Sequence, residues 1–292
     1  MTLASSLRGG ALAAVVTAFA IAPALFAAEE KFEFPDASQH ATITQRIGVT
    51  DVSVEYSRPD KRDREIFGGL VPYGKVWRTG ANSPTKIKFS DAVKIGGQEV
   101  PAGEYALYTI PNENEWTIVL SKNLKLWGAY GYKPDADALR VNVKPTALAD
   151  PVETFTIGFD NLKDDGATLA LEWDKTRVPV ELTVNTMEKV TSAIETALKN
   201  PSELKPPFYY KAASFYFEHD KDLAQAAKWM DQALAKQEPA AYYMYYKKAQ
   251  IEANLGHTAE AKAAGEHANE RPKEDPEPGA RARRNSQCRT AR

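Results

Sequence analysis

The amino-acid sequence predicts an antiparallel β-sandwich followed by an all-helical domain. From about Ala41 to Thr186, short segments alternate apolar and polar residues, as strands with one buried face do. Turn residues separate these segments and no helical period intervenes, which is typical of an antiparallel sandwich or barrel of about nine or ten strands. Beyond Thr186 the apolar period becomes helical. Of the two β architectures we expect the sandwich.

The first 28 residues have the order of a secretory signal peptide. Arg8 precedes an apolar run, and small residues follow up to Ala28. The run is short and rich in alanine for a membrane span, although an uncleaved anchor is the alternative. We therefore expect an exported protein, periplasmic or secreted, with no membrane span after signal removal. Residues 29–40 are then a linker, and residues 41–186 form the β-sandwich domain.

Composition restricts the class of protein further. With 292 residues, 43% of them hydrophobic and 26% charged, the chain is long enough for two domains with buried cores. The net charge of −2 provides no field that would attract nucleic acid, so we expect no such partner. Cys288 is the only cysteine in the sequence, which excludes an intramolecular disulfide.

The strand segments follow one another through the sandwich. The clearest alternation places Val52, Val54 and Tyr56 between polar residues. Gly96-Gly97 and the turn at 112–115 each predict a hairpin. The expected strands are residues 51–57, 86–90, 93–95, 98–100, 105–110, 116–121, 139–143, 154–159, 168–173 and 178–184.

The helical domain is expected at residues 187–270. Its first helix is indicated by apolar residues at helical spacing, from Met187 to Leu198, and ends before Pro201. Four more helices are expected at 208–218, 223–236, 240–255 and 258–269. Residues 271–292 lose the periodicity and gain proline and arginine. We expect a disordered tail there, the alternatives being a basic binding tail and an atypical end of the reading frame.

The last four helices form two similar pairs. Small residues recur 35 positions apart, at Ser214 and Ala249, at Ala226 and Ala261, and at Ala233 and Ala268. This spacing resembles tetratricopeptide repeats, whose period is about 34 residues. The resemblance implies a helical protein-interaction region with a peptide-binding groove. The alternative is a helical domain that only braces the sandwich, which two repeats favour because they make little groove.

The region from Tyr56 to Pro111 holds the most distinctive motifs. They are Y-S-R-P at 56–59, I-F-G-G-L-V-P-Y-G at 66–74, W-R-T-G-A-N at 77–82, P-A-G-E-Y at 101–105 and I-P at 110–111. In this order they closely resemble domain of unknown function 2911, a family of exported bacterial proteins. The resemblance covers residues 45–184 and includes Trp116, Trp127-Gly128 and Trp173.

The resemblance implies a β-rich domain with a variable, often helical C-terminal region. It implies no activity and no catalytic residue. One departure is Asp63, which precedes Arg64 where the family usually has glycine. If that position needs a positive φ angle, aspartate tolerates it better than most residues, though less well than glycine.

The residues of the sandwich exclude several chemistries. The four histidines, His40, His219, His257 and His267, all lie outside residues 41–186, and so does the cysteine. Serine nucleophiles usually need a histidine base, and zinc sites usually need histidine or cysteine. Nucleotide-binding glycine motifs are absent from the sequence as well. We therefore expect no cofactor and no metal site.

Carboxylates are the remaining route to catalysis. Glu55, Asp91, Glu104 and Glu115 could meet across strands and act as an acid and a base. The alternative function is thus a histidine-independent hydrolase that acts on glycans. The structural alternative is that these side chains form the solvated face of the sheet.

A cationic and aromatic set in the central region is the candidate binding site. Guanidinium groups suit carboxylate or phosphate, and aromatic faces suit sugars or cations. The set is Arg58, Arg62, Arg64, Arg78 and Asn82, with the nearby aromatic residues Tyr73, Trp77 and Trp127. Alternatively, Trp77 fills the core, Arg78 pairs with Glu55 or Glu104, and Asn82 stabilises a turn. The sequence thus predicts a non-enzymatic module that binds a protein or small molecule of the cell envelope.

Overall fold

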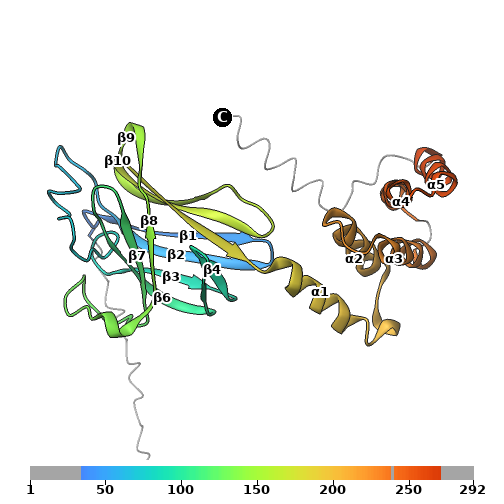
Figure 1. Ribbon diagram of the computed structural model, residues 1–292, viewed down its shortest axis with the longest axis horizontal. Coiled ribbons are helices and arrows are strands. Elements are labelled where there is room, and N and C mark those ends of the chain that lie inside the picture. The colour runs from blue at the N-terminus through green and yellow to red at the C-terminus, as the bar shows by residue number, and fades with distance from the viewer. Residues whose placement is uncertain (1–33, 238–239, 271–292) are drawn as a thin grey trace, which may run out of the picture. The chain divides into compact units, whose positions relative to one another are not determined.

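The computed structural model describes residues 34–237 and 240–270 (Figure 1). The signal peptide expected at 1–28 and the tail expected at 271–292 lie outside these ranges. In the described part of the chain, ten strands in two antiparallel sheets precede five α-helices. The prediction of a β-sandwich followed by a helical domain is therefore confirmed.

The larger sheet has six strands in the order β1-β2-β3-β6-β7-β8, and every neighbouring pair is antiparallel. The turn between β6 and β7 is the one expected at 112–115. The strands are β1 (Gln39–Ile47), β2 (Thr50–Arg58), β3 (Thr85–Phe89), β6 (Gly103–Ile110), β7 (Trp116–Ser121) and β8 (Asp137–Val143).

The smaller sheet has four strands in the order β5-β4-β10-β9. Its strands are β4 (Val93–Ile95), β5 (Gln98–Val100), β9 (Thr146–Asp160) and β10 (Gly166–Val184). The Gly96-Gly97 hairpin joins β4 to β5 as predicted. The two strands predicted at 168–173 and 178–184 form one strand, β10. Its pairing with β9 shifts register around Asp174, whose φ of 50° marks a bulge that interrupts the alternation.

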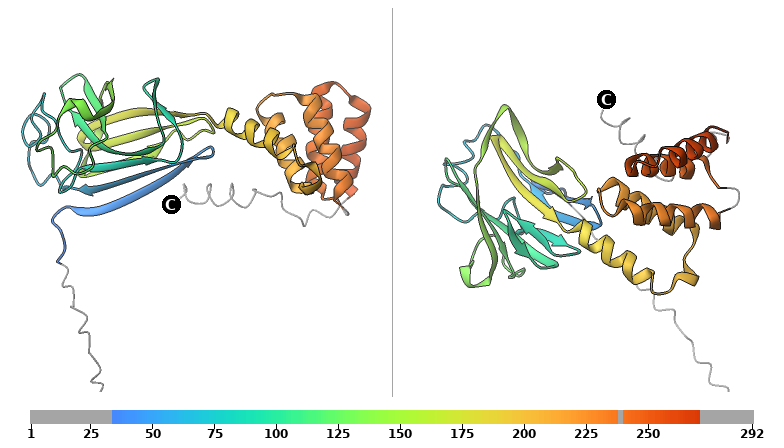
Figure 2. Two further views of the ribbon diagram at one scale, coloured as in Figure 1. Left: turned by 90° about the horizontal axis from the view of Figure 1, so that it is seen from below. Right: turned by 45° about the vertical axis from the view of Figure 1, so that its right-hand side comes forward.

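The main core lies between the two sheets, which face each other in Figures 1 and 2. Val52, Val54 and Tyr56 of β2 are buried, as the alternation predicts, while Asp51 and Glu55 are exposed. Other fully buried core residues include Ile47, Ile66, Ile87, Phe89, Ile95, Leu107, Trp116, Ile118, Leu120, Phe155 and Trp173.

Strand β6 departs from the alternation because both of its faces are covered. Its residues from Tyr105 to Thr109 are all buried. On the outer face of the sheet, Ala106 and Tyr108 form a second apolar cluster with Val119 of β7. The segment that links β7 to β8 packs against this cluster. The expectation of one solvated face thus fails for β6.

The helices follow the predicted order. Asn185 and Asp222 accept side-chain cap hydrogen bonds at the first turns of α1 and α3, and Gly256 ends α4 in the left-handed conformation. None of the helices in the described residues is long and apolar enough to cross a membrane. The helices are α1 (Thr186–Ala197), α2 (Pro206–Glu218), α3 (Leu223–Lys236), α4 (Tyr242–Leu255) and α5 (Thr258–Glu270), with short 3-10 turns at η1 (Pro134–Ala136) and η2 (Pro201–Glu203).

The helices have their own apolar core. Ala226 and Ala233 are fully buried, as expected for small residues where helices approach closely. Many of the aromatic residues of this domain, such as Tyr209, Tyr216 and Trp229, are also core residues. A helical C-terminal domain is therefore present, while its tetratricopeptide character stays a prediction.

Candidate functional site

The motif I-F-G-G-L-V-P-Y-G forms a compact turn within the long connection between β2 and β3. The amide of Val71 donates to the carbonyl of Ile66 at 2.8 Å, and the amide of Gly68 donates to the carbonyl of Val71 at 2.9 Å. Ile66 and Val71 are buried in the sandwich core. These two apolar anchors fix the turn to the end of the sandwich.

Glycine at position 68 leaves room for the ring of Tyr73. Gly68 has a φ of +94°, and a Cβ atom there would lie 2.9 Å from Cε2 of Tyr73. The amide of Gly74 then donates to the carbonyl of Pro111 at 2.9 Å, which ties the turn to the end of β6. The glycines of the motif therefore place Tyr73 beside the β6–β7 turn, with 39% of its surface exposed.

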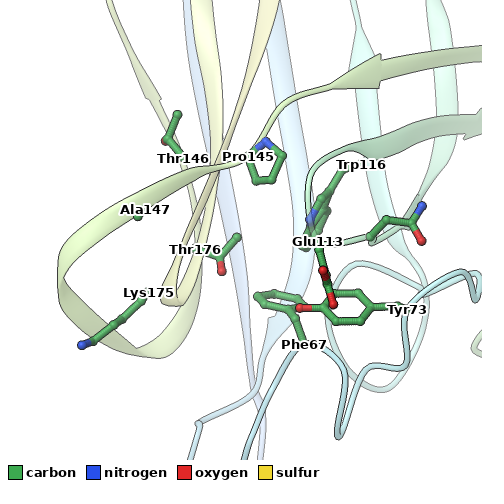
Figure 3. A pocket seen from close by; sticks show the side chains of 10 residues that line it. Phe67, Tyr73, Glu113, Trp116, Pro145, Thr146, Ala147, Lys175 and Thr176 are labelled. Carbon is green, nitrogen blue, oxygen red and sulfur yellow. The ribbon is translucent and has the colours of Figure 1, made fainter.

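A small cleft lies where this turn meets the β6–β7 turn, the β8–β9 connection and β10 (Figure 3). We name it the aromatic cleft. Its volume is about 180 Å³. The lining residues are Phe67, Tyr73, Asn112, Glu113, Trp116, Pro145, Thr146, Ala147, Lys175 and Thr176.

The apolar wall of the aromatic cleft belongs to the core. The ring of Phe67 packs edge-to-face on Trp116, with centroids 4.7 Å apart, and on Trp77 at 6.0 Å. Trp116 is 2% exposed, so it can move little. Because packed aromatic rings hold few alternative rotamers, the wall is preformed.

The charged side chains of the aromatic cleft are Glu113 and Lys175. Figure 3 shows the carboxylate of Glu113 directed toward the rings of Tyr73 and Phe67, whereas the side chain of Lys175 is directed away from them. Within the part of the chain that the structure describes, Glu113 has no ion-pair partner. The cleft therefore presents a carboxylate beside two aromatic rings, with the ammonium group of Lys175 directed away from them.

The volume of the aromatic cleft limits what it can hold. Its 180 Å³ is several times the space that one water molecule needs. Pockets for whole drug-sized ligands have volumes of about 300–1,000 Å³. The cleft thus has the size of a side chain or of the head group of a larger molecule.

Three of the residues predicted for the binding site, Arg58, Asn82 and Arg64, form internal hydrogen bonds. Arg58 donates from Nε to the carbonyl of Phe155 at 3.1 Å and from Nη2 to Oγ1 of Thr156 at 2.7 Å, which links β2 to β9. Asn82 has a φ of 55° and donates from Nδ2 to Ser57 Oγ, at 3.3 Å. The hydrogen bond of Asn82 and its positive φ correspond to the structural alternative for this residue, in which it stabilises a turn.

Arg64 stabilises the loop that precedes the motif. Its Nε donates to the carbonyl of Lys61 at 2.9 Å, and its Nη2 donates to the carbonyl of Asp60. The preceding residue, Asp63, has a φ of 56°. This is a positive φ, which glycine adopts most readily and aspartate tolerates better than most residues.

Arg78 and Trp127 lie near each other on the outer face of the larger sheet. A Cβ atom added to Gly128, the neighbour of Trp127, would lie 3.8 Å from Nη1 of Arg78. Among the described residues, the buried Nε of Arg78 has no acceptor, and Glu55 is within ion-pair distance of Lys86 at 3.9 Å. The structure therefore places Arg78 beside Gly128, the neighbour of Trp127, and binding by the predicted set stays a prediction.

Two arginine substitutions should have different effects on stability. Arg58→Ala removes the side-chain donor to the part-buried carbonyl of Phe155 and should lower the free energy of unfolding by about 1–3 kcal/mol.

Arg78→Met keeps the side-chain length and removes an unpaired buried donor, so the free energy of unfolding should stay within about 1 kcal/mol of the parent. Urea denaturation measures both. A larger loss for Arg78→Met would contradict the absence of an acidic partner.

The four carboxylates considered for catalysis do not line the aromatic cleft. Asp91 forms an ion pair with Lys189, and the hydrogen bond from Lys189 lowers the pKa of Asp91. Glu115 accepts a hydrogen bond from Asn142. Glu104 lies opposite Lys88 in the register of β6 and β3. In the described ranges, no three His, Cys, Asp or Glu side chains are grouped to hold a metal ion.

None of the five residues predicted for the binding site lines the aromatic cleft. Of the lining residues, the sequence singles out Tyr73 only as an aromatic neighbour of the arginine set, and Phe67 lies in the same conspicuous motif. The sequence places Glu113 in a hairpin turn, and Thr146 and Thr176 carry no sequence signal. Their role depends on strand pairing, since Thr176 lies opposite Ala147 in the β9–β10 register.

The fold and the cleft define a two-sheet antiparallel β-sandwich with a small aromatic cleft at one end. Residues 38–182 match the family model described as "Protein of unknown function (DUF2911)". This match supports the resemblance that the motifs indicate. No curated protein and no solved structure matches the chain.

Proposed function

We propose that the protein is an exported, non-enzymatic binding protein whose aromatic cleft holds the ammonium or quaternary ammonium group of a small molecule. The observation that carries the proposal is the carboxylate of Glu113 beside the rings of Tyr73 and Phe67 (Figure 3). Aromatic faces attract cations through their quadrupole, and aromatic cages recognise quaternary ammonium groups. The carboxylate adds a charge that selects a cation over a neutral group of the same shape.

The composition of the aromatic cleft supports binding rather than hydrolysis. Glycoside cleavage by carboxylates needs two of them, one as acid and one as base or nucleophile. Of the residues that line the cleft, Glu113 is the only carboxylate. Thr146, Thr176 and Asn112 provide hydrogen-bonding groups at its edge, which suit the polar remainder of a ligand.

The proposal also includes export of the protein and a role of its helices in binding a protein partner. Export is supported by the signal-peptide pattern of residues 1–28. Two helix pairs, α2 with α3 and α4 with α5, support a role in protein interaction, and the partner belongs in the cell envelope.

The test is a calorimetric titration of the protein with choline and with its neutral isostere, 3,3-dimethylbutan-1-ol. Choline should bind saturably with a Kd of about 1 mM, because a single small group contributes limited binding energy. The isostere should bind at least about fivefold more weakly, because it lacks the charge. Equal binding of the two compounds, or binding of glucose without binding of choline, would overturn the proposal.

A further inference from the structure

The segment of residues 122–133, which links β7 to β8, is a second conspicuous surface. We name it the basic loop; it is drawn in green in Figure 1. Its underside is anchored: Leu124, Leu126 and Tyr132 pack on the apolar cluster of the outer sheet face. The hydroxyl of Tyr108 also donates to the carbonyl of Gly128 at 3.3 Å. The loop is thus held on the sheet.

The ends of the basic loop are fixed as well. The amide of Lys122 donates to the carbonyl of Ala136 at 2.8 Å. The hydroxyl of Tyr132 donates to the carboxylate of Asp137 at 2.6 Å, and Nε of Arg140 donates to the same oxygen at 2.6 Å. Burial, together with the bond to Asp137, raises the pKa of Tyr132 to about 12. Tyr132 therefore stays neutral and bonded at ordinary pH.

The outer side of the basic loop exposes two large aromatic side chains. Trp127 is 66% exposed and Tyr130 is 79% exposed. The amide of Tyr130 donates to the carbonyl of Trp127 at 3.3 Å, so one turn presents both rings. The other tryptophans, Trp77, Trp116, Trp173 and Trp229, are all at most 8% exposed. Because the loop is anchored, the exposure of its two rings is a fixed feature of the surface.

The charges of the basic loop have one sign. Lys122, Lys125 and Lys133 are exposed, and residues 122–134 include no acid. Within the described ranges, none of the three lysines has an ion-pair partner. The guanidinium of Arg78 lies beneath Gly128 and adds a further positive charge. Of the acids that follow, Asp137 is bonded to Arg140, and Asp135 is exposed.

We propose that the basic loop binds the surface of an anionic lipid bilayer. Tryptophan and tyrosine prefer the level of the lipid head groups, because their rings are apolar and their tips are polar. Lysines on both sides of the aromatic turn are attracted to lipid phosphates. Ring insertion and a basic patch are two signals that together attach a protein to a membrane, whereas either one alone gives only marginal binding. The loop shares no residue with the aromatic cleft, so the surface would act independently of the cleft.

Tryptophan fluorescence tests the proposal, because Trp127 is the one strongly exposed tryptophan of the protein. The protein from residue 29 onward avoids the apolar run of residues 11–26. Vesicles of equal parts phosphatidylglycerol and phosphatidylcholine should shift the emission to the blue, and brominated lipids should quench it. Vesicles of phosphatidylcholine alone should bind at least about tenfold more weakly, because the lysines lose their anionic counterpart.

Variants separate the contributions of rings and charges, with co-sedimentation as the readout. The double variant Trp127→Ala, Tyr130→Ala should lose binding, and the triple variant K122Q/K125Q/K133Q should bind at least about tenfold more weakly. The control K94Q/K163Q/K211Q removes the same charge from exposed lysines elsewhere and should bind as the parent does. Equal losses in both triple variants, no emission shift with anionic vesicles, or tight binding of soluble heparin without vesicle binding would overturn the proposal.

Discussion

Replacing Trp173 by alanine should lower the free energy of unfolding by about 3–5 kcal/mol. Trp173 is 1% exposed and stacks on Trp77, with ring centroids 5.7 Å apart. It also contacts the rings of Phe155 and Phe67, and its indole donates to the carbonyl of Glu153 at 3.0 Å. The substitution would leave a cavity among packed rings and remove one of the two hydrogen bonds that the carbonyl of Glu153 accepts, the other coming from the amide of Lys61 at 2.8 Å. Guanidinium denaturation with linear extrapolation measures the change.

The same substitution at Trp127 is the matched control. Trp127 is 66% exposed, so its removal should change the free energy of unfolding by about 0.5 kcal/mol or less. A loss below about 1 kcal/mol for Trp173→Ala, or equal losses for the two variants, would contradict the assignment of Trp173 to the core and of Trp127 to the surface.

Replacing Glu113 by lysine should weaken choline binding at least about 30-fold, which corresponds to about 2 kcal/mol. The substitution removes the attractive charge of the aromatic cleft and places an ammonium group beside Tyr73 and Phe67. A like charge next to a bound cation is repelled, and the new side chain competes for the same aromatic faces. The milder Glu113→Gln should give a smaller loss of about fivefold to tenfold. Calorimetric titration measures both variants.

Glu115→Lys is the control for this charge reversal. Glu115 belongs to the same turn, but its carboxylate accepts a hydrogen bond from Asn142 of β8 at 2.9 Å and does not line the cleft. Because its carboxylate is bonded to β8 and is exposed to screening salt, its replacement should change choline affinity by less than about threefold. If Glu113→Lys and Glu115→Lys weaken choline binding equally, the loss comes from the general charge of the surface, and the cleft is not the binding site.

Much of the sandwich could be predicted because local patterns carry its architecture. The alternation at Val52, Val54 and Tyr56 and the hairpin at Gly96-Gly97 both correspond to the structure. Alternation fails where a second layer covers the sheet, as on β6 under the basic loop. It also fails at Asp174, where a bulge shifts the register without ending β10. Neither feature is encoded in the short-range spacing of apolar residues.

The candidate site could be predicted only in part, because its walls come from segments far apart in the sequence. The motif at 66–74 contains Phe67 and Tyr73, but strand pairing brings Glu113 and Thr176 to them. Conversely, the sequence makes Arg58 conspicuous, whereas its guanidinium donates to a backbone carbonyl and a hydroxyl of β9. A charged residue in a motif therefore indicates that its side chain has a polar partner. Only the fold shows whether that partner belongs to the protein or to a ligand.

The binding of an ammonium group in the aromatic cleft is tested most directly by intermolecular NOE spectroscopy. Choline is added at saturation to protein whose aromatic residues are labelled with carbon-13. Cross-peaks between the N-methyl protons of choline and the ring protons of Phe67 and Tyr73 are the predicted result, because both rings line the cleft. Cross-peaks only to Trp127 or Tyr130, or none to any ring at saturating choline, would contradict it.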